Sequence, residues 1–232
     1  MSKNPKTRIS LITKLLLFLL MAAISVVGFQ LVTRNVMKED LLGKNPICSL
    51  PCWINITPGI THSDEAEKIL QETAYIDKGS IKQSGTDDFG GCTWNWKVSG
   101  RRTLPKLSWQ NGVVREISLG LTFNFTVDEV LNEFGPPEAV GVIEGGTPEN
   151  WYWVVDMFYP QAGIQLKVYT PSFSSVIETS TEVGVVVLFS PSSLENRVSE
   201  LFPDSSSGRM NRIYRSWKGF GDIKQLYEGI EK

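Results

Sequence analysis

Residues 48–70 read CSLPCWINITPGITHSDEAEKIL and contain the features on which we base the fold prediction. They hold two of the three cysteines, the only histidine and a Pro-Gly pair that leads into an amphipathic segment. Ser63 or Thr61 can cap a helix there, and the acidic residues that follow favour the positive end of the helix dipole. Between Ala66 and Leu70 the apolar residues recur at helical spacing and form one stripe, so this helix needs a sheet to pack on.

Alternating apolar and polar residues after this helix predict antiparallel strands. Residues 92–98 alternate, with Trp94 and Trp96 on one side, which we interpret as the core side. Residues 107–110 and 113–121 flank Asn111-Gly112. Asn-Gly is the strongest short hairpin signal, because both positions accept the positive φ of a type I′ turn. The polar, Gly-rich residues 77–91 are predicted to form an exposed loop.

A second helix is predicted to begin after Thr126 and to end at Gly135, which Pro136 follows. Strands are expected at 151–159, 163–169 and 184–190, and a further helix at 192–202. We therefore predict an α+β fold in which an N-terminal transmembrane helix precedes two helix-plus-antiparallel-sheet units in tandem, residues 48–121 and 122–202. Residues 203–232 form a C-terminal tail.

The sequence around each predicted helix resembles the helix motif of the SmpA/OmlA/BamE lipoproteins. The residues that carry this resemblance are Pro58-Gly59 before Glu65-Ala66, and the run from Thr126 to Pro137. Two such units in tandem resemble the architecture of β-lactamase inhibitor proteins. The resemblance implies an extracytoplasmic fold with helices on one face of the sheet, and binding rather than catalysis. The lipid-attachment cysteine is absent and no Gly-Pro follows the first helix, so neither outer-membrane assembly nor lactamase inhibition is carried over.

Residues 15–33 contain no charged side chain and are long enough as a helix, about 28 Å, to match the hydrocarbon core of a bilayer. Four basic residues precede them, which predicts an uncleaved signal anchor with residues 1–14 in the cytoplasm. Residues 34–47 would be a stalk, and the rest of the chain would be extracytoplasmic in a single-pass protein of the cell membrane. A cleaved signal peptide is the alternative.

Three cysteines in an exported domain predict one disulfide and one free thiol. We prefer Cys52–Cys92, because it closes a loop of about 40 residues and so contributes most in the loop-entropy model. Cys48–Cys92 is the alternative. A Cys48–Cys52 bridge would close a small loop and constrain little. The cysteines and the single histidine do not have zinc-ligand spacing, so no metal is predicted.

Charge and motif content argue against several functional classes. Residues 45–232 carry 16 basic and 23 acidic side chains, which does not suit a nucleic-acid-binding domain. His62 is the only histidine, so any catalytic triad that needs a histidine would have to use it. A histidine beside the start of a helix is more often solvated or a helix cap than catalytic. Asp87-Asp88 and Glu144 are carboxylates in polar loops, and no phosphate-binding motif is present. We therefore predict neither an enzyme nor a cofactor.

The polar side of the predicted sheet is the most informative surface. It carries Tyr152, Phe158 and Tyr169 among polar residues, a mixture typical of protein-binding surfaces, and we predict that these three bind a partner. The function predicted is a membrane-anchored, non-catalytic binding or scaffold protein of the cell envelope, with an envelope protein as partner. The alternatives are an inhibitor or sensor of a hydrolase, secreted or anchored, and a cell-wall glycan-binding module, which would expose some tryptophans.

Overall fold

The computed structural model of the chain describes residues 11–41, 48–97, 104–121, 124–147, 150–171, 174–201 and 214–227. The chain forms two compact units, Met1–Met37 and Lys38–Lys232.

The predicted transmembrane anchor at 15–33 falls within helix α1 (Leu11–Leu41). Among the described residues, no helix is long and apolar enough to cross a membrane. On this finding the transmembrane helix, the single-pass localisation in the cell membrane and the membrane-anchored part of the predicted function are wrong.

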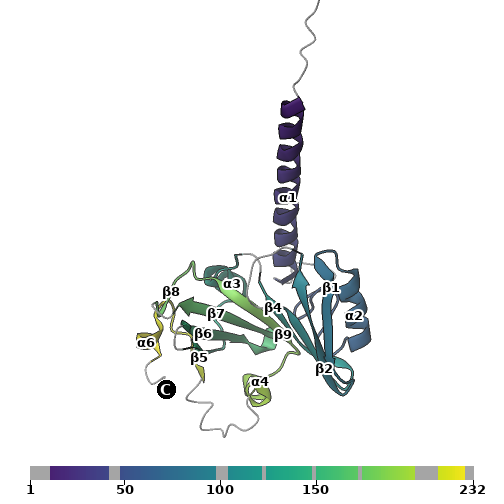
Figure 1. Cartoon of the computed structure of the whole chain (residues 1–232). Helices are drawn as coiled ribbons and strands as arrows, with labels where there is room; N and C mark the ends of the chain where they lie inside the picture. The colour runs from purple at the N-terminus through teal and green to yellow at the C-terminus, as the bar shows by residue number, and fades with distance from the viewer. Residues whose placement is uncertain are drawn as a thin grey trace, which may run out of the picture. The chain divides into compact units, whose positions relative to one another are not determined.

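One antiparallel sheet of nine strands dominates the second unit, in the order β1-β2-β3-β4-β9-β7-β6-β5-β10 (Figure 1). Its strands are β1 (Ile76–Gly85), β2 (Phe89–Trp96), β3 (Lys106–Gln110), β4 (Val113–Gly120), β5 (Ala139–Thr147), β6 (Asn150–Tyr159), β7 (Ile164–Pro171), β9 (Val183–Phe189) and β10 (Tyr214–Arg215). Because β4 pairs with β9, the strands after the two predicted helices form one continuous sheet. The predicted fold class of an anchor and two tandem helix-plus-sheet units is therefore corrected to one large antiparallel sheet with helices.

The remaining elements are short. Helices α2 (Ser63–Glu72), α3 (Val127–Phe134), α4 (Leu194–Leu201) and α6 (Ile223–Leu226), the 3₁₀ turn η1 (Pro160–Ala162) and the small sheet of β8 (Val176–Ile177) and β11 (Gly221–Asp222) complete the described unit. The position of each helix is defined by its local sequence. At the start of α3, Thr126 and Glu129 form a reciprocal capping box, which confirms the predicted cap.

The Asn-Gly hairpin is also confirmed. Asn111 and Gly112 have φ values of 52° and 71° and join β3 to β4. By contrast, the predicted loop at 77–91 is wrong, because this range contains most of β1 and the start of β2. Strand β1 lies at the edge of the sheet and most of its side chains are exposed, so it lacks the alternation by which a half-buried strand is recognised.

The two faces of the sheet differ in what covers them. We call the face that carries Trp94, Val155, Met157 and Tyr159 the helix face; all four side chains are buried. Phe134 of α3 contacts Tyr159, with ring centroids 5.6 Å apart, and Trp53 stacks on Trp94 at 5.9 Å. The opposite side, which we call the open face, carries Tyr152, Asp156, Phe158 and Tyr169, since directly paired residues of neighbouring strands share a face.

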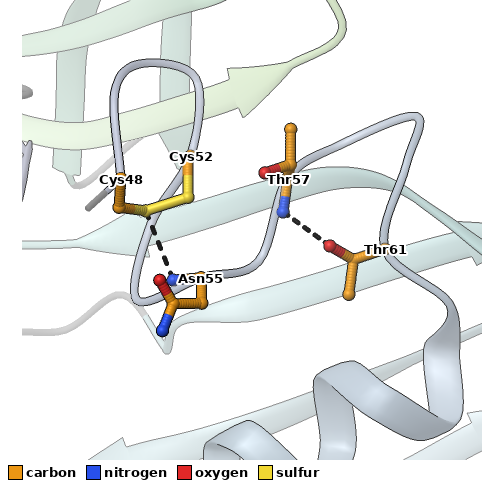
Figure 2. Close-up of a disulfide and its surroundings, with 5 residues drawn as sticks. All are labelled: Cys48, Cys52, Asn55, Thr57 and Thr61. Carbon is orange, nitrogen blue, oxygen red and sulfur yellow. Dashed lines mark hydrogen bonds between the residues drawn. A yellow bond between two sulfur atoms is a disulfide. The ribbon is translucent and has the colours of Figure 1, made fainter.

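The disulfide differs from the prediction. Cys48 is bonded to Cys52 (Figure 2), with their Cα atoms 5.2 Å apart. Cys92 is a buried free thiol. The two cysteines flank a turn closed by a hydrogen bond from Cys52 N to Ser49 O, which brings their side chains within bonding range. Neither Cys52–Cys92 nor Cys48–Cys92 forms, since Cys92 lies inside β2, where Leu107 is its register partner in β3.

The free thiol of Cys92 should be unreactive in the folded protein. Burial, and secondarily the negative charge of Glu67, raises the pKa of this thiol to about 12, and the thiolate is the nucleophile. We expect a disulfide-forming aromatic reagent at pH 8 to label one thiol rapidly in guanidinium chloride and to label the native protein at least about 100-fold more slowly. Equal rates in the two conditions would contradict the burial of Cys92.

Candidate binding surface on the open face

The structure brings together two of the three residues predicted to bind a partner and separates the third. Tyr152 and Tyr169 lie on adjacent strands of the open face, and each is 37 % exposed. Phe158 lies on the same face but is 0 % exposed. The ring of Tyr214, from β10, contacts the ring of Phe158 in an edge-to-face arrangement at 5.0 Å. The prediction for Phe158 is therefore wrong, because a later segment of the chain covers it.

The exposed tyrosines contact each other, and Tyr169 packs on a glycine of the neighbouring strand. Their ring centroids are 5.7 Å apart at an interplanar angle of 64°. Tyr169 also lies against Gly184 of β9: a Cβ added to Gly184 would be 2.5 Å from Cδ2 of the tyrosine ring. The absence of a side chain at Gly184 lets the ring pack on the sheet, so Tyr169 is held in place before any partner binds.

Two aliphatic residues extend this pair into a continuous apolar strip. Ile143 of β5 is the register partner of Val154 in β6, and Val154 is the register partner of Tyr169 in β7. Ile143 is 40 % exposed and Val154 is half-buried. We call Ile143, Tyr152, Val154 and Tyr169 the tyrosine strip. It crosses three neighbouring strands on one face.

An ion pair borders the strip. Asp156 is buried, and its Oδ1 lies 2.9 Å from Nζ of Lys167, the residue paired with it across β6 and β7. Burial of the ring, followed by the negative charge of Asp156 and the neighbouring Tyr152, raises the pKa of Tyr169 above its usual value. Tyr169 therefore stays a neutral hydrogen-bond donor well into the alkaline range.

Two other parts of the open face are covered by the chain itself. Arg197 of α4 is buried against this face, with Nη2 2.8 Å from Glu116 Oε2 and 3.3 Å from Gln165 Oε1. Its guanidinium also lies 3.9 Å from the centroid of the Phe189 ring. Helix α4 thus covers one part of the face and Tyr214 covers another, which leaves the tyrosine strip accessible.

Filling the space above Gly184 should displace Tyr169. Because burial is the main cause of the raised pKa, we expect Gly184→Val to return the pKa of Tyr169 towards that of a free tyrosine. The measurement is a titration of the Tyr169 ring carbon by NMR. Gly79→Val is the matched control, since the nearest atom to an added Cβ there is 3.6 Å away. An unchanged pKa in Gly184→Val would contradict the packing of the ring on Gly184.

The other residues considered from sequence do not converge on a site. His62 is exposed at the N-cap of α2, where its side chain makes no capping hydrogen bond. Asp87 and Asp88 are exposed in the turn between β1 and β2, and the side chain of Glu144 lies outside the part that the structure describes. Within the described ranges, no three His, Cys, Asp or Glu side chains lie close enough together to hold a metal ion.

A cleft of about 430 Å³ opens beside the β3–β4 hairpin. Gln110, Arg115 and Glu200 contribute polar groups to its lining. Arg115 Nη2 lies 4.0 Å from Glu200 Oε2, and both side chains are more than one-third exposed. None of the residues predicted to bind a partner lines this cleft. Its two charged groups, Arg115 and Glu200, form an ion pair with each other.

Sequence reasoning missed Ile143 and Val154. The alternation that would have revealed Ile143 is interrupted by Gly141, Gly145 and Gly146, so β5 was not predicted as a strand. Val154 sits in the predicted strand at 151–159, but only its neighbours across β5 and β7 show that it links Ile143 to Tyr169.

Comparison of the chain with models of protein families, with curated proteins and with solved structures gives no match. The resemblance to SmpA/OmlA/BamE-type proteins therefore stays a prediction, and the function is argued from the surface alone.

Proposed function

We propose that this protein is a non-catalytic binding module that recognises another protein through the tyrosine strip. The observation that carries the proposal is the exposed, mutually packed pair Tyr152–Tyr169 on a sheet face of which α4 and Tyr214 cover other parts. Tyrosine is enriched at protein interfaces, because it supplies a large apolar ring, a polar tip and few rotatable bonds. The packing of Tyr169 on Gly184 further lowers the ordering entropy that binding would cost.

The placement of five of the seven tryptophans favours a protein partner over a glycan. Sugar-binding sites present aromatic rings to solvent, whereas Trp53, Trp94, Trp109 and Trp153 are all buried. Trp96 is half-buried against Trp53 and Trp94 in the same cluster. These rings belong to the packing of the sheet.

A photo-cross-linking experiment tests the proposal. We would place p-benzoylphenylalanine at Tyr152 in the full chain, in cells of the source organism, and at Phe220 as the matched control, since Phe220 is a comparably exposed aromatic residue that is not part of the tyrosine strip. We expect a discrete protein adduct at position 152 that is absent at position 220. Adducts of the same size and amount at both positions, or none at 152, would contradict the proposal.

A further inference from the structure

The segment of residues 214–227 contacts the part of the sheet that carries the tyrosine strip. At its start, β10 pairs with β5. Further along, β11 pairs with β8, the strand that follows β7 in the chain. In α6, Nζ of Lys224 lies 5.6 Å from the centroid of the ring of Trp153, a residue of β6. We call residues 214–227 the clasp, because they link β5, β6 and the strand after β7.

Hydrogen bonds and buried side chains anchor the second half of the clasp. The hydroxyl of Ser175 donates to Oδ1 of Asp222 at 2.6 Å, and the backbone N–H of Ile223 donates to the carbonyl of Ser175 at 2.7 Å. Ile223 is 0 % exposed and Tyr227 is 2 % exposed. The backbone N–H of Lys218 donates to the Tyr227 hydroxyl at 3.3 Å, which extends the anchor back towards β10. The clasp is therefore fixed to the domain before a partner binds.

Tyr214 brings a further aromatic ring to the open face, next to the tyrosine strip. It is the register partner of Gly141, and a Cβ added to Gly141 would lie 3.0 Å from its ring. Gly141 lies two residues before Ile143 in β5, so the two residues share a face and Tyr214 adjoins one end of the strip. The Tyr214 ring packs on Phe158, which is completely buried, whereas Tyr214 itself is only half-buried.

The carboxylate of Asp156 connects Tyr214 with the strip electrostatically. Asp156 is the register partner of Gly141 on the β6 side. Burial of the ring, followed by the negative charge of Asp156, raises the pKa of Tyr214, and the same two causes in the same order raise the pKa of Tyr169. Both hydroxyls are therefore neutral hydrogen-bond donors on one face, within range of one carboxylate.

We propose that Tyr214 is a further contact residue for the partner of the tyrosine strip, and that the hydrogen bond between Ser175 and Asp222 positions it. This inference rests on the proposed function and extends the binding surface from β5, β6 and β7 to β10. Because the anchored clasp already holds the Tyr214 ring, little ordering entropy is lost when the ring contacts a partner. Asp222 is a positioning residue, since it acts through Tyr214.

Photo-cross-linking from position 214 tests the contact. We would place p-benzoylphenylalanine at Tyr214 in the full chain, under the conditions used for position 152, and at Phe89 as the control, since Phe89 is an exposed aromatic residue of the distant strand β2. We expect the protein captured at position 152 to be captured at 214 and not at 89. Capture at 152 without capture at 214 would overturn the inference and leave the proposed function standing. Without capture at 152, the proposed function itself falls.

A double-mutant cycle tests the positioning by Asp222. In isothermal titration with the captured protein, Tyr214→Ala and Asp222→Ala should each weaken binding at least about fivefold. The double variant should bind no more weakly than Tyr214→Ala alone, because the effect of Asp222 passes through Tyr214. Multiplied losses in the double variant would contradict the positioning. Unchanged binding of Tyr214→Ala would overturn the inference, and so would tighter binding, which would show that the clasp competes with the partner.

Asp77→Ala is the matched control for Asp222→Ala. Oδ1 of Asp77 accepts a hydrogen bond from the backbone N–H of Gly79, two residues along the chain, just as Oδ1 of Asp222 accepts one from Lys224. Asp77 lies in β1, at the opposite end of the sheet order from β10. Its replacement should leave the dissociation constant within about twofold of the wild-type value. A loss equal to that of Asp222→Ala would contradict a specific role for the clasp.

Discussion

Replacing Arg197 by alanine is expected to lower the free energy of unfolding by about 3–5 kcal/mol, the range seen when one partner of a buried ion pair is removed. The Arg197 side chain is 2 % exposed and pairs with Glu116 on the open face of the sheet. Alanine would leave the Glu116 carboxylate without this partner and would remove the planar group that packs on Phe189. Both losses weaken the attachment of α4 to the sheet, because Arg197 is the residue through which the helix reaches Glu116, Gln165 and Phe189.

Urea denaturation of the wild-type and Arg197→Ala chains gives this difference directly. Glu200→Gln is the matched control: Glu200 also pairs with Arg197, at 3.4 Å, but its side chain is 45 % exposed. Exposed pairs contribute about 0–1 kcal/mol, so the control should shift the free energy of unfolding by less than about 1 kcal/mol. A loss below about 1 kcal/mol in Arg197→Ala would show that α4 is not held by this contact.

The second large effect is expected at Trp94. Trp94→Ala should lower the free energy of unfolding by about 3–5 kcal/mol, as for other buried aromatic residues cut to alanine. The ring stacks on Trp53 and meets Trp96 edge-on at 6.0 Å, so its removal opens a cavity in the middle of an aromatic cluster. In this cluster Trp53, which precedes α2, packs on Trp94 and Trp96 of β2.

A second variant, Trp94→Phe, separates the contribution of the ring from that of its indole nitrogen. Within the described residues, Nε1 of Trp94 is buried and has no hydrogen-bond partner. Trp94→Phe removes this unpaired donor while it keeps an aromatic ring, so we expect a loss well below that of alanine, about 1–2 kcal/mol. Chemical denaturation followed by far-UV circular dichroism measures both variants. Equal losses for alanine and phenylalanine would contradict the role of ring packing at this position.

Local sequence signals account for the elements that the sequence predicted well. Asn111-Gly112 specifies its hairpin through two positive φ values, and Thr126 specifies the start of α3 through its capping box. These signals act within a few residues, so no knowledge of the fold is needed. The alternation around Trp94 likewise predicted which side of that strand faces the core.

The errors arose where the outcome depends on distant parts of the chain. The disulfide was chosen by loop entropy, but pairing requires proximity, and Cys48 and Cys52 are brought together by one turn while Cys92 lies within a strand. Alternation placed Phe158 on the correct face, but it could not show that Tyr214 would cover it. The strands of the two predicted units form one sheet, because β4 pairs with β9, and these two strands lie far apart in the sequence.

The candidate surface was predicted only in part for the same reason. Tyr152 and Tyr169 could be assigned to one face from alternation, whereas their contact at 5.7 Å depends on the register between β6 and β7. The role of Gly184 depends on the neighbouring strand β9, to which no local signal points. A binding surface on a sheet is a property of several strands in register, so its residues become visible only when the pairing is known.

The most direct test of the account is the affinity of the partner cross-linked at position 152 for purified variants of the full chain. Isothermal titration would compare the wild-type chain with Tyr152→Ala, Tyr169→Ala and the control Phe220→Ala. If the tyrosine strip is the binding surface, each tyrosine change should weaken binding by about 2 kcal/mol, roughly 30-fold, while the control stays within about twofold. Equal dissociation constants for all four chains would contradict the central claim.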